Sequence, residues 1–181
     1  MHKGRPLLII PFTSSDNPLQ TLPESSQLKY LKAYLRGAGV RCVVVEQNYF
    51  DRDYLDEFAA FYSKSARGYP NICQRLHFFK IDLEKAELYQ AMGQTGQEEV
   101  LQDGYLGFMV RRPLDTAPFG RTVLSWYENR DERSERITPV LRDYTCNVLG
   151  IRLKVKGIPW QQQDRGVSAC ARIALWSMFH S

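Results

Sequence analysis

Strand-like segments are concentrated in the second half of this chain, and this uneven distribution limits the folds open to it. Strand character is found at 105–112, 121–127, 142–148 and 151–158, with turns rich in proline, glycine or charged residues between the segments. The first half instead mixes strand-like runs with helical spacing. Helices and strands that alternate early, followed by strands that gather later, predict an α+β fold.

The first half of the chain predicts a β-loop-α-β unit. Residues 5–12 form a short apolar run, 13–23 are rich in Ser, Asn, Asp and Pro, and 24–38 place apolar residues at helical spacing. Residues 40–46 are apolar and β-branched, as in a buried strand. Because two strands joined through a helix commonly run parallel, we predict an N-terminal α/β layer with a partly parallel sheet.

Further elements are expected on either side of the strand-rich segment. Residues 51–63 carry apolar side chains on one helical face, and Asp51 near their start suits the positive end of a helix. A strand at 74–81 and a helix at 83–92 are predicted to follow. The last expected element is a C-terminal helix that begins near Cys170.

The composition is that of a globular chain. Its 181 residues are 44% hydrophobic and 24% charged, which is enough for a normal core in one domain, or in one domain and part of a second. No apolar segment approaches the roughly 20 residues that span a bilayer. The apolar run at 7–10 is too short for a secretory signal. We therefore expect no membrane partner and a location in the cytoplasm.

The formal net charge of +4 is too small to indicate nucleic-acid binding by itself. Arginines are frequent between 111 and 152, but neighbouring acidic residues cancel much of their charge. No RRM, KH or zinc-finger pattern is present, so nucleic acid is not an expected partner. Phosphate-loop and dinucleotide fingerprints are also missing, and no cofactor is expected.

The four cysteines, at 42, 73, 146 and 170, are widely and irregularly spaced. Without a Cys-x-x-Cys pair, a zinc site is not expected, and a cytosolic chain of this size is not expected to carry a disulfide framework. Cys42 and Cys73 lie beside apolar residues and are predicted to be small core residues.

Cys170 carries the strongest sign of chemistry in the sequence. A polar loop with glutamines at 161–163 leads through Gly166 to an apolar helix that begins near Cys170. The thiolate is the nucleophilic form of cysteine, and the positive end of a helix lowers the pKa of a thiol. A side-chain amide beside the sulfur would stabilise a developing oxyanion.

The segment from 160 to 181 resembles the nucleophile segment of papain-like thiol peptidases, and it is most similar to that of the C39-like peptidases. The resemblance implies that Cys170 is the nucleophile for amide hydrolysis and that Gln163 (or Gln162) is an oxyanion donor. It implies a peptide or protein substrate. It also implies a histidine base that follows the cysteine along the chain.

His180 is the histidine that follows Cys170, but it does not fit the role of base. Ten residues of helix would separate the two side chains by about 15 Å. We therefore interpret 159–181 as the incomplete start of a peptidase unit that follows an α/β domain of unknown role at 1–158. We expect no peptidase activity from the chain as it stands.

An upstream base would require a permuted order, in which the histidine precedes the cysteine. His77 is the candidate for that role, within the strand-like run at 74–81. Alternation along the strand places His77 on the same side as Phe79 and opposite Leu76 and Phe78. A satisfied structural histidine is the alternative interpretation.

A second candidate site consists of Arg111, Arg112 and Arg121, in two strand-like runs joined by a proline-containing turn. Their guanidinium groups would bind an anion such as a phosphate or a carboxylate if they converged. The alternative is a surface hairpin whose arginines pair with local acids.

The chain as a whole also has a second interpretation. On this interpretation, the protein is a non-catalytic α/β binding or scaffolding protein, and Cys170 is a core residue. No oligomeric state is predicted.

Overall fold

The computed structural model describes residues 7–84, 88, 97–126, 141–148, 150–163 and 178–179. A five-stranded sheet has the order β1-β2-β3-β4-β5, and a second sheet is the hairpin of β6 and β7. The strands are β1 (Leu7–Pro11), β2 (Cys42–Tyr49), β3 (Cys73–Phe79), β4 (Tyr105–Arg111), β5 (Phe119–Leu124), β6 (Arg142–Val148) and β7 (Ile151–Gly157). The helices are α1 (Ser26–Gly37), α2 (Arg52–Glu57) with its π-helical continuation η1 (Phe58–Tyr62), and α4 (Gln97–Gly104).

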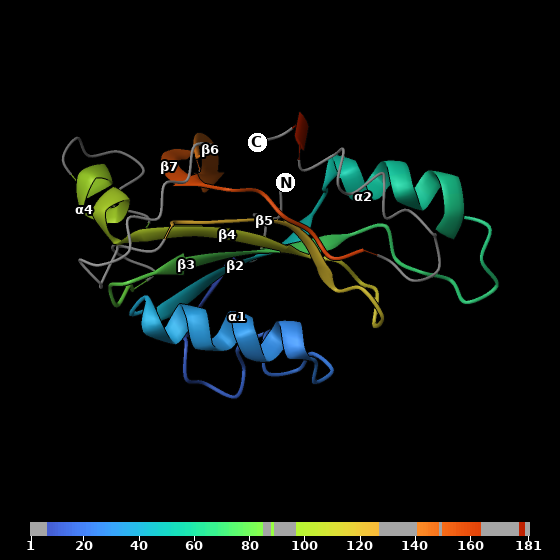
Figure 1. The fold of residues 1–181 in the computed structure, drawn as a ribbon, viewed down its shortest axis with the longest axis horizontal. Helices are drawn as coiled ribbons and strands as arrows, with labels where there is room; N and C mark the ends of the chain where they lie inside the picture. The colour runs from blue at the N-terminus through green and yellow to red at the C-terminus, as the bar shows by residue number, and fades with distance from the viewer. Residues whose placement is uncertain are drawn as a thin grey trace, which may run out of the picture.

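The five-stranded sheet is the middle layer of the described structure (Figure 1). Helix α1 covers one face, and the β6–β7 hairpin and helix α2 cover different parts of the other face. Helix α4 lies beside the hairpin. The side-chain amide of Gln102 in α4 donates to the carbonyl of Lys154 at 2.9 Å and accepts from its N–H at 2.7 Å.

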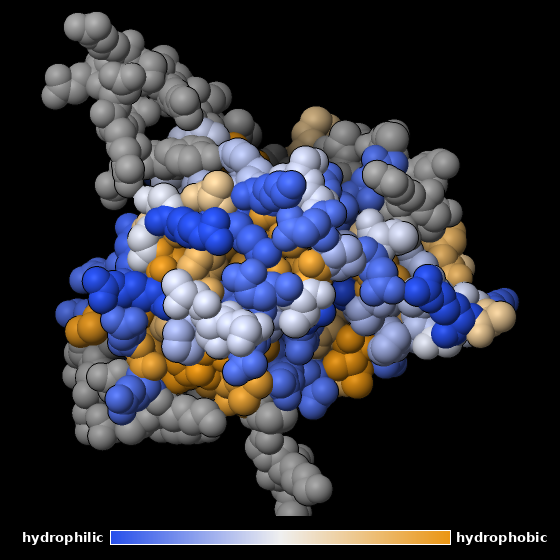
Figure 2. All heavy atoms as spheres, turned by 90° about the horizontal axis from the view of Figure 1, so that it is seen from below, coloured by the Kyte–Doolittle hydropathy of each residue, from blue (hydrophilic) through white to orange (hydrophobic). Residues whose placement is uncertain are grey.

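Helix α1 forms where the sequence predicts it and buries one apolar face. Ser25 caps the helix, because its Oγ accepts from the N–H of Leu28 at 3.1 Å. Leu28, Leu31 and Leu35 are buried against the sheet. Seen from the α1 side, the surface is largely hydrophilic with hydrophobic areas between (Figure 2). Helix α1 is therefore the outer layer on this side of the sheet.

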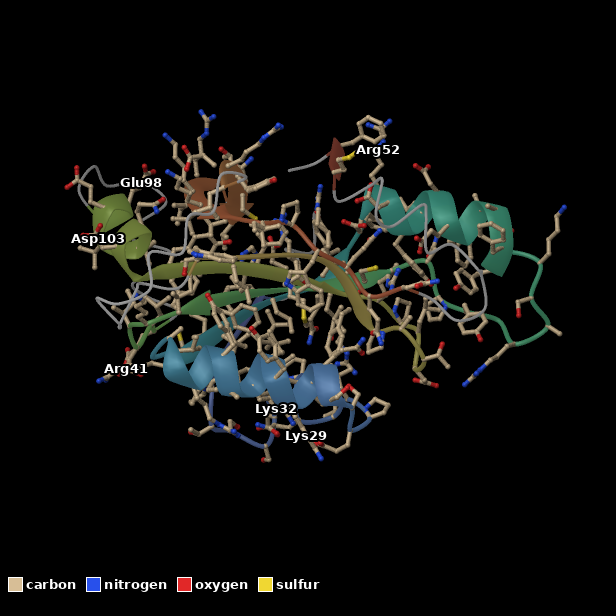
Figure 3. The ribbon with its side chains drawn as sticks, in the orientation of Figure 1. Lys29, Lys32, Arg41, Arg52, Glu98 and Asp103 are labelled. Atoms are coloured by element: carbon tan, nitrogen blue, oxygen red, sulfur yellow. The ribbon has the colours of Figure 1, made fainter. Side chains whose placement is uncertain are left out.

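The opposite face is covered by a hairpin with strict alternation. Ile151, Leu153 and Val155 of β7 are buried, whereas the basic residues between them are exposed. The buried side chains join a core that includes Val44 and Phe79 of the five-stranded sheet. Burying each of these side chains contributes about 2 kcal/mol to the free energy of unfolding. Charged residues of the helices, such as Arg52 of α2 and Glu98 and Asp103 of α4, lie on the outside (Figure 3).

The predicted partly parallel sheet is wrong, because every pair of strands in the described part of the chain is antiparallel. The cause lies in residues 12–25. Phe12 donates its N–H to the carbonyl of Arg41 at 2.7 Å, so β1 ends where α1 ends and β2 begins. The connecting loop must then run back along the whole length of α1 before the helix starts. Helix α1 therefore runs in the same direction as β1, and β2 returns antiparallel to both.

The loop at 13–23, which its composition predicts, is an ordered part of the fold. The side chain of Asn17 is fully buried, donates to the carbonyl of Phe12 at 2.8 Å and accepts from the N–H of Leu19 at 3.0 Å. Leu19 and Leu22 pack into the core under α1. The loop thus has its own apolar contacts, which fix the reversal of the chain.

The positions of most elements agree with the sequence predictions. All seven strands and helices α1 and α2 lie within a few residues of the expected segments, which confirms the broad α+β class. Within the predicted helix at 83–92, residues 83, 84 and 88 are described, and of the C-terminal helix only 178–179 are. Among the described residues, no helix is long and apolar enough to cross a membrane.

Gly107 marks the point where β4 passes closest to β5. Its φ of +123° is a conformation that residues with a side chain rarely adopt. A Cβ atom at this position would lie 2.1 Å from the carbonyl oxygen of Val123. The register of β3 against β4 also shifts between Phe78 and Phe79, beside this glycine.

We expect Gly107→Ala to lower the free energy of unfolding by about 3 kcal/mol or more, because it combines backbone strain with a clash against the main chain. Gly37→Ala is the matched control. A Cβ at Gly37 meets nothing within 4 Å, so this change should be neutral or stabilise by up to about 1 kcal/mol. Urea unfolding of both variants measures the difference, and equal effects would contradict the close approach of β4 and β5.

Candidate functional site

Glu46, His77 and Cys146 meet on the face of the sheet that the hairpin covers. They come from β2, β3 and β6, respectively. His77 shares this face with Phe79, while Leu76 and Phe78 point toward α1, which confirms the alternation predicted from the sequence. The hairpin therefore brings a thiol from a distant part of the sequence to a histidine in the main sheet.

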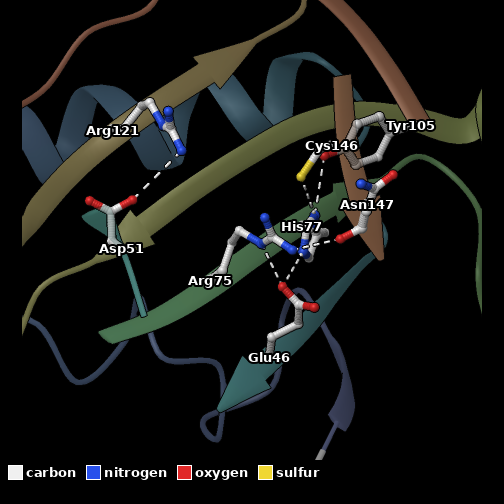
Figure 4. A network of polar contacts seen from close by, with 8 residues as sticks. All are labelled: Glu46, Asp51, Arg75, His77, Tyr105, Arg121, Cys146 and Asn147. Carbon is white, nitrogen blue, oxygen red and sulfur yellow. Dashed lines mark hydrogen bonds and ion pairs between the residues drawn. The ribbon is translucent and has the colours of Figure 1, made fainter. Parts of the chain in front are cut away.

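The imidazole of His77 lies between the other polar groups (Figure 4). Its Nε2 is 3.1 Å from Oε2 of Glu46, and its Nδ1 is 3.1 Å from the hydroxyl of Tyr105. Nδ1 also lies 4.0 Å from Sγ of Cys146. The histidine side chain is completely buried. A cysteine, a histidine and an orienting carboxylate in this order are the components of a thiol-based catalytic triad.

The protonation of this group follows from its partners. Burial lowers the pKa of His77 despite the opposing effect of Glu46, so the ring is neutral at neutral pH. An ionised Glu46 only accepts hydrogen bonds, so Nε2 carries the proton and donates to the carboxylate. Nδ1 is then the acceptor, and the hydroxyl of Tyr105 donates to it.

Arg75 completes the charge balance around Glu46. Its Nε donates to Oε2 of Glu46, and its Nη2 donates to the carbonyl of Asn147 in β6 at 2.6 Å. Its guanidinium also lies over the ring of Tyr49, 4.3 Å from the centroid. Burial alone would raise the pKa of Glu46, but hydrogen bonds from His77 and Arg75 lower it to about 2. The carboxylate is therefore ionised and holds the hairpin to the sheet through Arg75.

The thiol of Cys146 is not activated in this arrangement. Burial raises its pKa, and Cys146 is only 3% exposed. A protonated sulfur without access to solvent does not attack a substrate. Glu46, His77 and Cys146 therefore have triad connectivity, but in this structure they act as a buried polar anchor between β3 and the hairpin.

A second anchor joins helix α2 to residues 160–162, the glutamine segment. Arg112 is buried, and its three nitrogens donate to the carbonyl of Ala117 at 3.0 Å, to Oε2 of Glu57 at 3.0 Å and to the carbonyl of Gln162 at 2.7 Å. Trp160 exchanges two backbone hydrogen bonds with Thr122 of β5, at 2.8 and 2.9 Å. Residues 160–162 thus add a short antiparallel stretch to the outer edge of β5.

The side chain of Gln162 is committed to this attachment. Its Oε1 accepts from the N–H of Phe119 at 3.3 Å, and its Nε2 donates to the side chain of Gln27 at 3.0 Å. Its backbone N–H also donates to the carbonyl of Phe119 at 2.8 Å. Gln163, the first choice for an oxyanion donor, follows directly and is half-buried.

The three arginines predicted to bind an anion do not meet at one point. Arg121 lies 3.7 Å from Oδ2 of Asp51 and over the ring of Phe108, and the charge of Arg112 also acts on Asp51. Arg111 instead donates from its Nη1 to Oε1 of Gln74 at 3.0 Å, although it lines the same cleft as Arg112. The charges of Arg112 and Arg121 both act on Asp51, whereas the guanidinium of Arg111 has a different partner.

Cys170 and His180 lie outside the described residues. Cys42 and Cys73 are buried, as the sequence predicts. Within the described part of the chain, no group of three or more His, Cys, Asp or Glu side chains is placed to hold a metal ion.

Glu46 and Cys146 were not anticipated from the sequence as partners of His77. One available signal was Glu46 itself, an acidic residue at the end of the apolar run 40–46, on the same strand face as Val44. Comparisons with models of protein families, with curated proteins and with solved structures find no match for this chain.

We expect the protein to lose stability in two stages as the pH falls. The folded pKa of His77 lies below its ordinary value of 6.5, so the unfolded chain takes up a proton first, and stability declines below about pH 6.5. The pKa of Glu46 is about 2 instead of 4.5, so a second loss falls between these values.

His77→Asn should remove the first stage, as seen in urea midpoints measured between about pH 7 and about pH 5. Glu99→Gln, which removes an exposed acid, is the control and should keep the wild-type profile. A His77→Asn profile as steep as the wild type would contradict this account.

We expect Arg112→Lys to lower the free energy of unfolding by about 3 kcal/mol, because the shorter cation leaves buried acceptors unpaired. Arg111→Lys, at the neighbouring position, should cost about 1 kcal/mol or less. Hydrogen exchange should also become faster at the amides of Trp160 and Gln162 in Arg112→Lys alone. Similar exchange rates in both variants would show that Arg112 does not hold the segment.

Proposed function

We propose that this chain carries the nucleophile segment of a papain-like thiol peptidase of the C39-like kind. Cys170 is the proposed nucleophile and Gln163 the proposed oxyanion donor. In a complete peptidase unit, the sulfur would add to an amide carbonyl carbon, a protonated base would supply a proton to the leaving amine as the C–N bond breaks, and water would then hydrolyse the thioester. The substrate class is a peptide or a protein.

The observation that supports this proposal is the double attachment of residues 160–162. Main-chain bonds to β5 and the side chain of Arg112 fix the chain eight residues before Cys170. Catalytic groups act best when rigid elements hold the segments that carry them. The sheet thus holds the start of the nucleophile segment in a fixed position.

The two glutamines of the proposal have different roles. The amide of Gln162 already binds Phe119 and Gln27, so it serves the attachment. The resemblance assigns Gln163, seven residues before Cys170, to the oxyanion. A donor aimed at a developing negative charge is worth several kcal/mol to the reaction.

His77 is given no chemical role in this proposal. Both of its nitrogens are engaged, by Glu46 and by Tyr105, in a completely buried position. The permuted dyad of His77 and Cys170 would require this anchor to come apart. The resemblance instead takes the base from a histidine that follows the cysteine.

The cytoplasm is part of the same proposal. Cys42, Cys73 and Cys146 are free thiols, which fits a reducing compartment. The competing proposal is a non-catalytic binding or scaffolding protein in which Cys170 packs in the core. The two differ in the reactivity of one thiol.

We expect Cys170 to react with iodoacetamide at about pH 6, where an ordinary thiol with a pKa near 8.5 is almost entirely protonated. Cys42, Cys73 and Cys146 should react slowly, because all three are buried and burial raises the pKa of Cys73 to about 12. Mass spectrometry of the digested protein reads each site separately.

Two controls accompany this measurement. Cys170→Ser should abolish the fast modification, and unfolding in urea at about pH 8.5 should make the other three cysteines reactive. A Cys170 that reacts no faster than an ordinary thiol at the same pH would refute an activated nucleophile and favour the binding or scaffolding protein.

A further inference from the structure

A cleft of about 570 Å³ lies at one end of the main sheet, and Arg112 of the second anchor is among its lining residues. Its walls come from segments 21–23, 47–48, 72–74 and 111–115, where β2 ends, β3 begins and β4 ends. The volume is in the range of sites that enclose small molecules. The chemistry of the cleft depends on the side chains that remain available for a ligand.

Arg111 is the unusual group in this cleft. The other arginines shielded from solvent in the described chain, Arg75, Arg112 and Arg121, each have a carboxylate oxygen within 3.7 Å. Arg111 is half-buried, and no carboxylate of the described residues forms an ion pair with it. Its hydrogen bond to Gln74 uses one of its five N–H donors. A partly desolvated guanidinium with open donors is stabilised by an anion.

Uncharged hydrogen-bonding groups share the cleft with Arg111. The side-chain amides of Gln47 and Asn48 line the cleft, and neither hydrogen-bonds another side chain or backbone group of the described chain. Asn48 has a φ of +58°, at a shift in the register between β2 and β3. Non-glycine residues in this region are often found at functional sites. The amides can donate to or accept from the polar atoms of a ligand.

Much of the remaining lining is apolar and stiff. Ile72 is 36% exposed at the cleft, and Leu22 lies on the same lining. Four prolines also line it: Pro23, Pro70, Pro113 and Pro118. Proline fixes the backbone angle φ, so such walls change little when a ligand binds. A ligand with an apolar body would fit this part of the cleft.

The charge balance selects a monoanion. The guanidinium of Arg112 faces Glu57, so the available positive charge is that of Arg111, on which the charge of Asp115 acts without a direct ion pair. Asp115 also lines the cleft and is paired with Arg67 at 2.9 Å. A phosphate dianion would bring excess negative charge close to Asp115, whereas a carboxylate matches one guanidinium in charge and in bidentate shape.

We infer that this cleft binds a carboxylate attached to an apolar body, with Arg111 on the carboxylate and the amides of Gln47 and Asn48 on its polar neighbours. The C-terminus of a peptide and a small organic acid share this chemistry. The inference is independent of Cys170 and of the proposed peptidase function.

The test is an NMR titration of the full chain with N-acetyl-leucine and with hexanoate. Saturable shifts are expected at the amides of 47–48, 72–74 and 111–115. N-acetyl-leucinamide, which lacks the carboxylate, should bind at least about tenfold more weakly. Tighter binding of N-acetyl-leucine than of hexanoate indicates a peptide C-terminus, and the reverse order indicates an organic acid.

Two variants test which side chains of the cleft contribute to binding. Arg111→Gln should weaken N-acetyl-leucine about tenfold or more, and Gln47→Glu should do the same by placing a negative charge in the cleft while Arg111 remains. Arg36→Gln, at an exposed position in α1, is the matched control and should bind as the wild type does.

Three results would overturn the inference. They are equal binding of the amide, unchanged binding in both folded variants, and no saturable shift with either carboxylate in the millimolar range. Tighter binding of phenyl phosphate than of both carboxylates would also overturn it, in favour of a phosphate site.

Discussion

The ionised carboxylate of Glu46 is the group on which one half of the molecule depends. A buried charge without partners costs several kcal/mol, so Glu46 is tolerable only because Arg75 and His77 both donate to it. Arg75 then reaches the carbonyl of Asn147 and ties the hairpin to the sheet. The position of β6 therefore depends on a charge pair inside the main sheet as well as on apolar packing.

The same face of the sheet is divided between two arginine anchors. Arg75 attaches the hairpin, and Arg112 attaches helix α2 through Glu57 and the glutamine segment through Gln162. Each anchor joins parts of the chain that are far apart in sequence by hydrogen bonds to main-chain carbonyls. Such bonds fix position more tightly than apolar contact does, because their geometry is directional. The two anchors thus define where the covering elements sit.

The sequence predicted the positions of elements far better than their directions. The apolar runs of β2 and β7 and the helical spacing of α1 are local signals, and local signals determine local structure. Strand direction instead depends on how far the loop at 12–25 travels, and the buried side chains of Asn17, Leu19 and Leu22 hold that loop in place. An asparagine in a polar loop looks the same in sequence whether it is buried or exposed.

The candidate site shows the same limit. His77 was found because histidine is rare in this chain and alternation gave its face. Cys146 could not be paired with it, since 69 residues separate the two and the contact exists only once the hairpin folds over β3. Tyr105 and Glu46 reach His77 from neighbouring strands, and their contact depends on a strand order that the sequence did not reveal.

The adjacent residues Arg111 and Arg112 show why residue type alone does not assign a role. Both arginines line the cleft, but the guanidinium of Arg112 meets Glu57 of α2 and that of Arg111 meets Gln74. Full pairing makes Arg112 part of the architecture, because each of its nitrogens has a protein acceptor. Among the described residues, Gln74 is the one hydrogen-bond partner of the Arg111 side chain, so its other donors are open to a ligand or water. The availability of donors, more than the charge itself, separates a binding residue from a structural one.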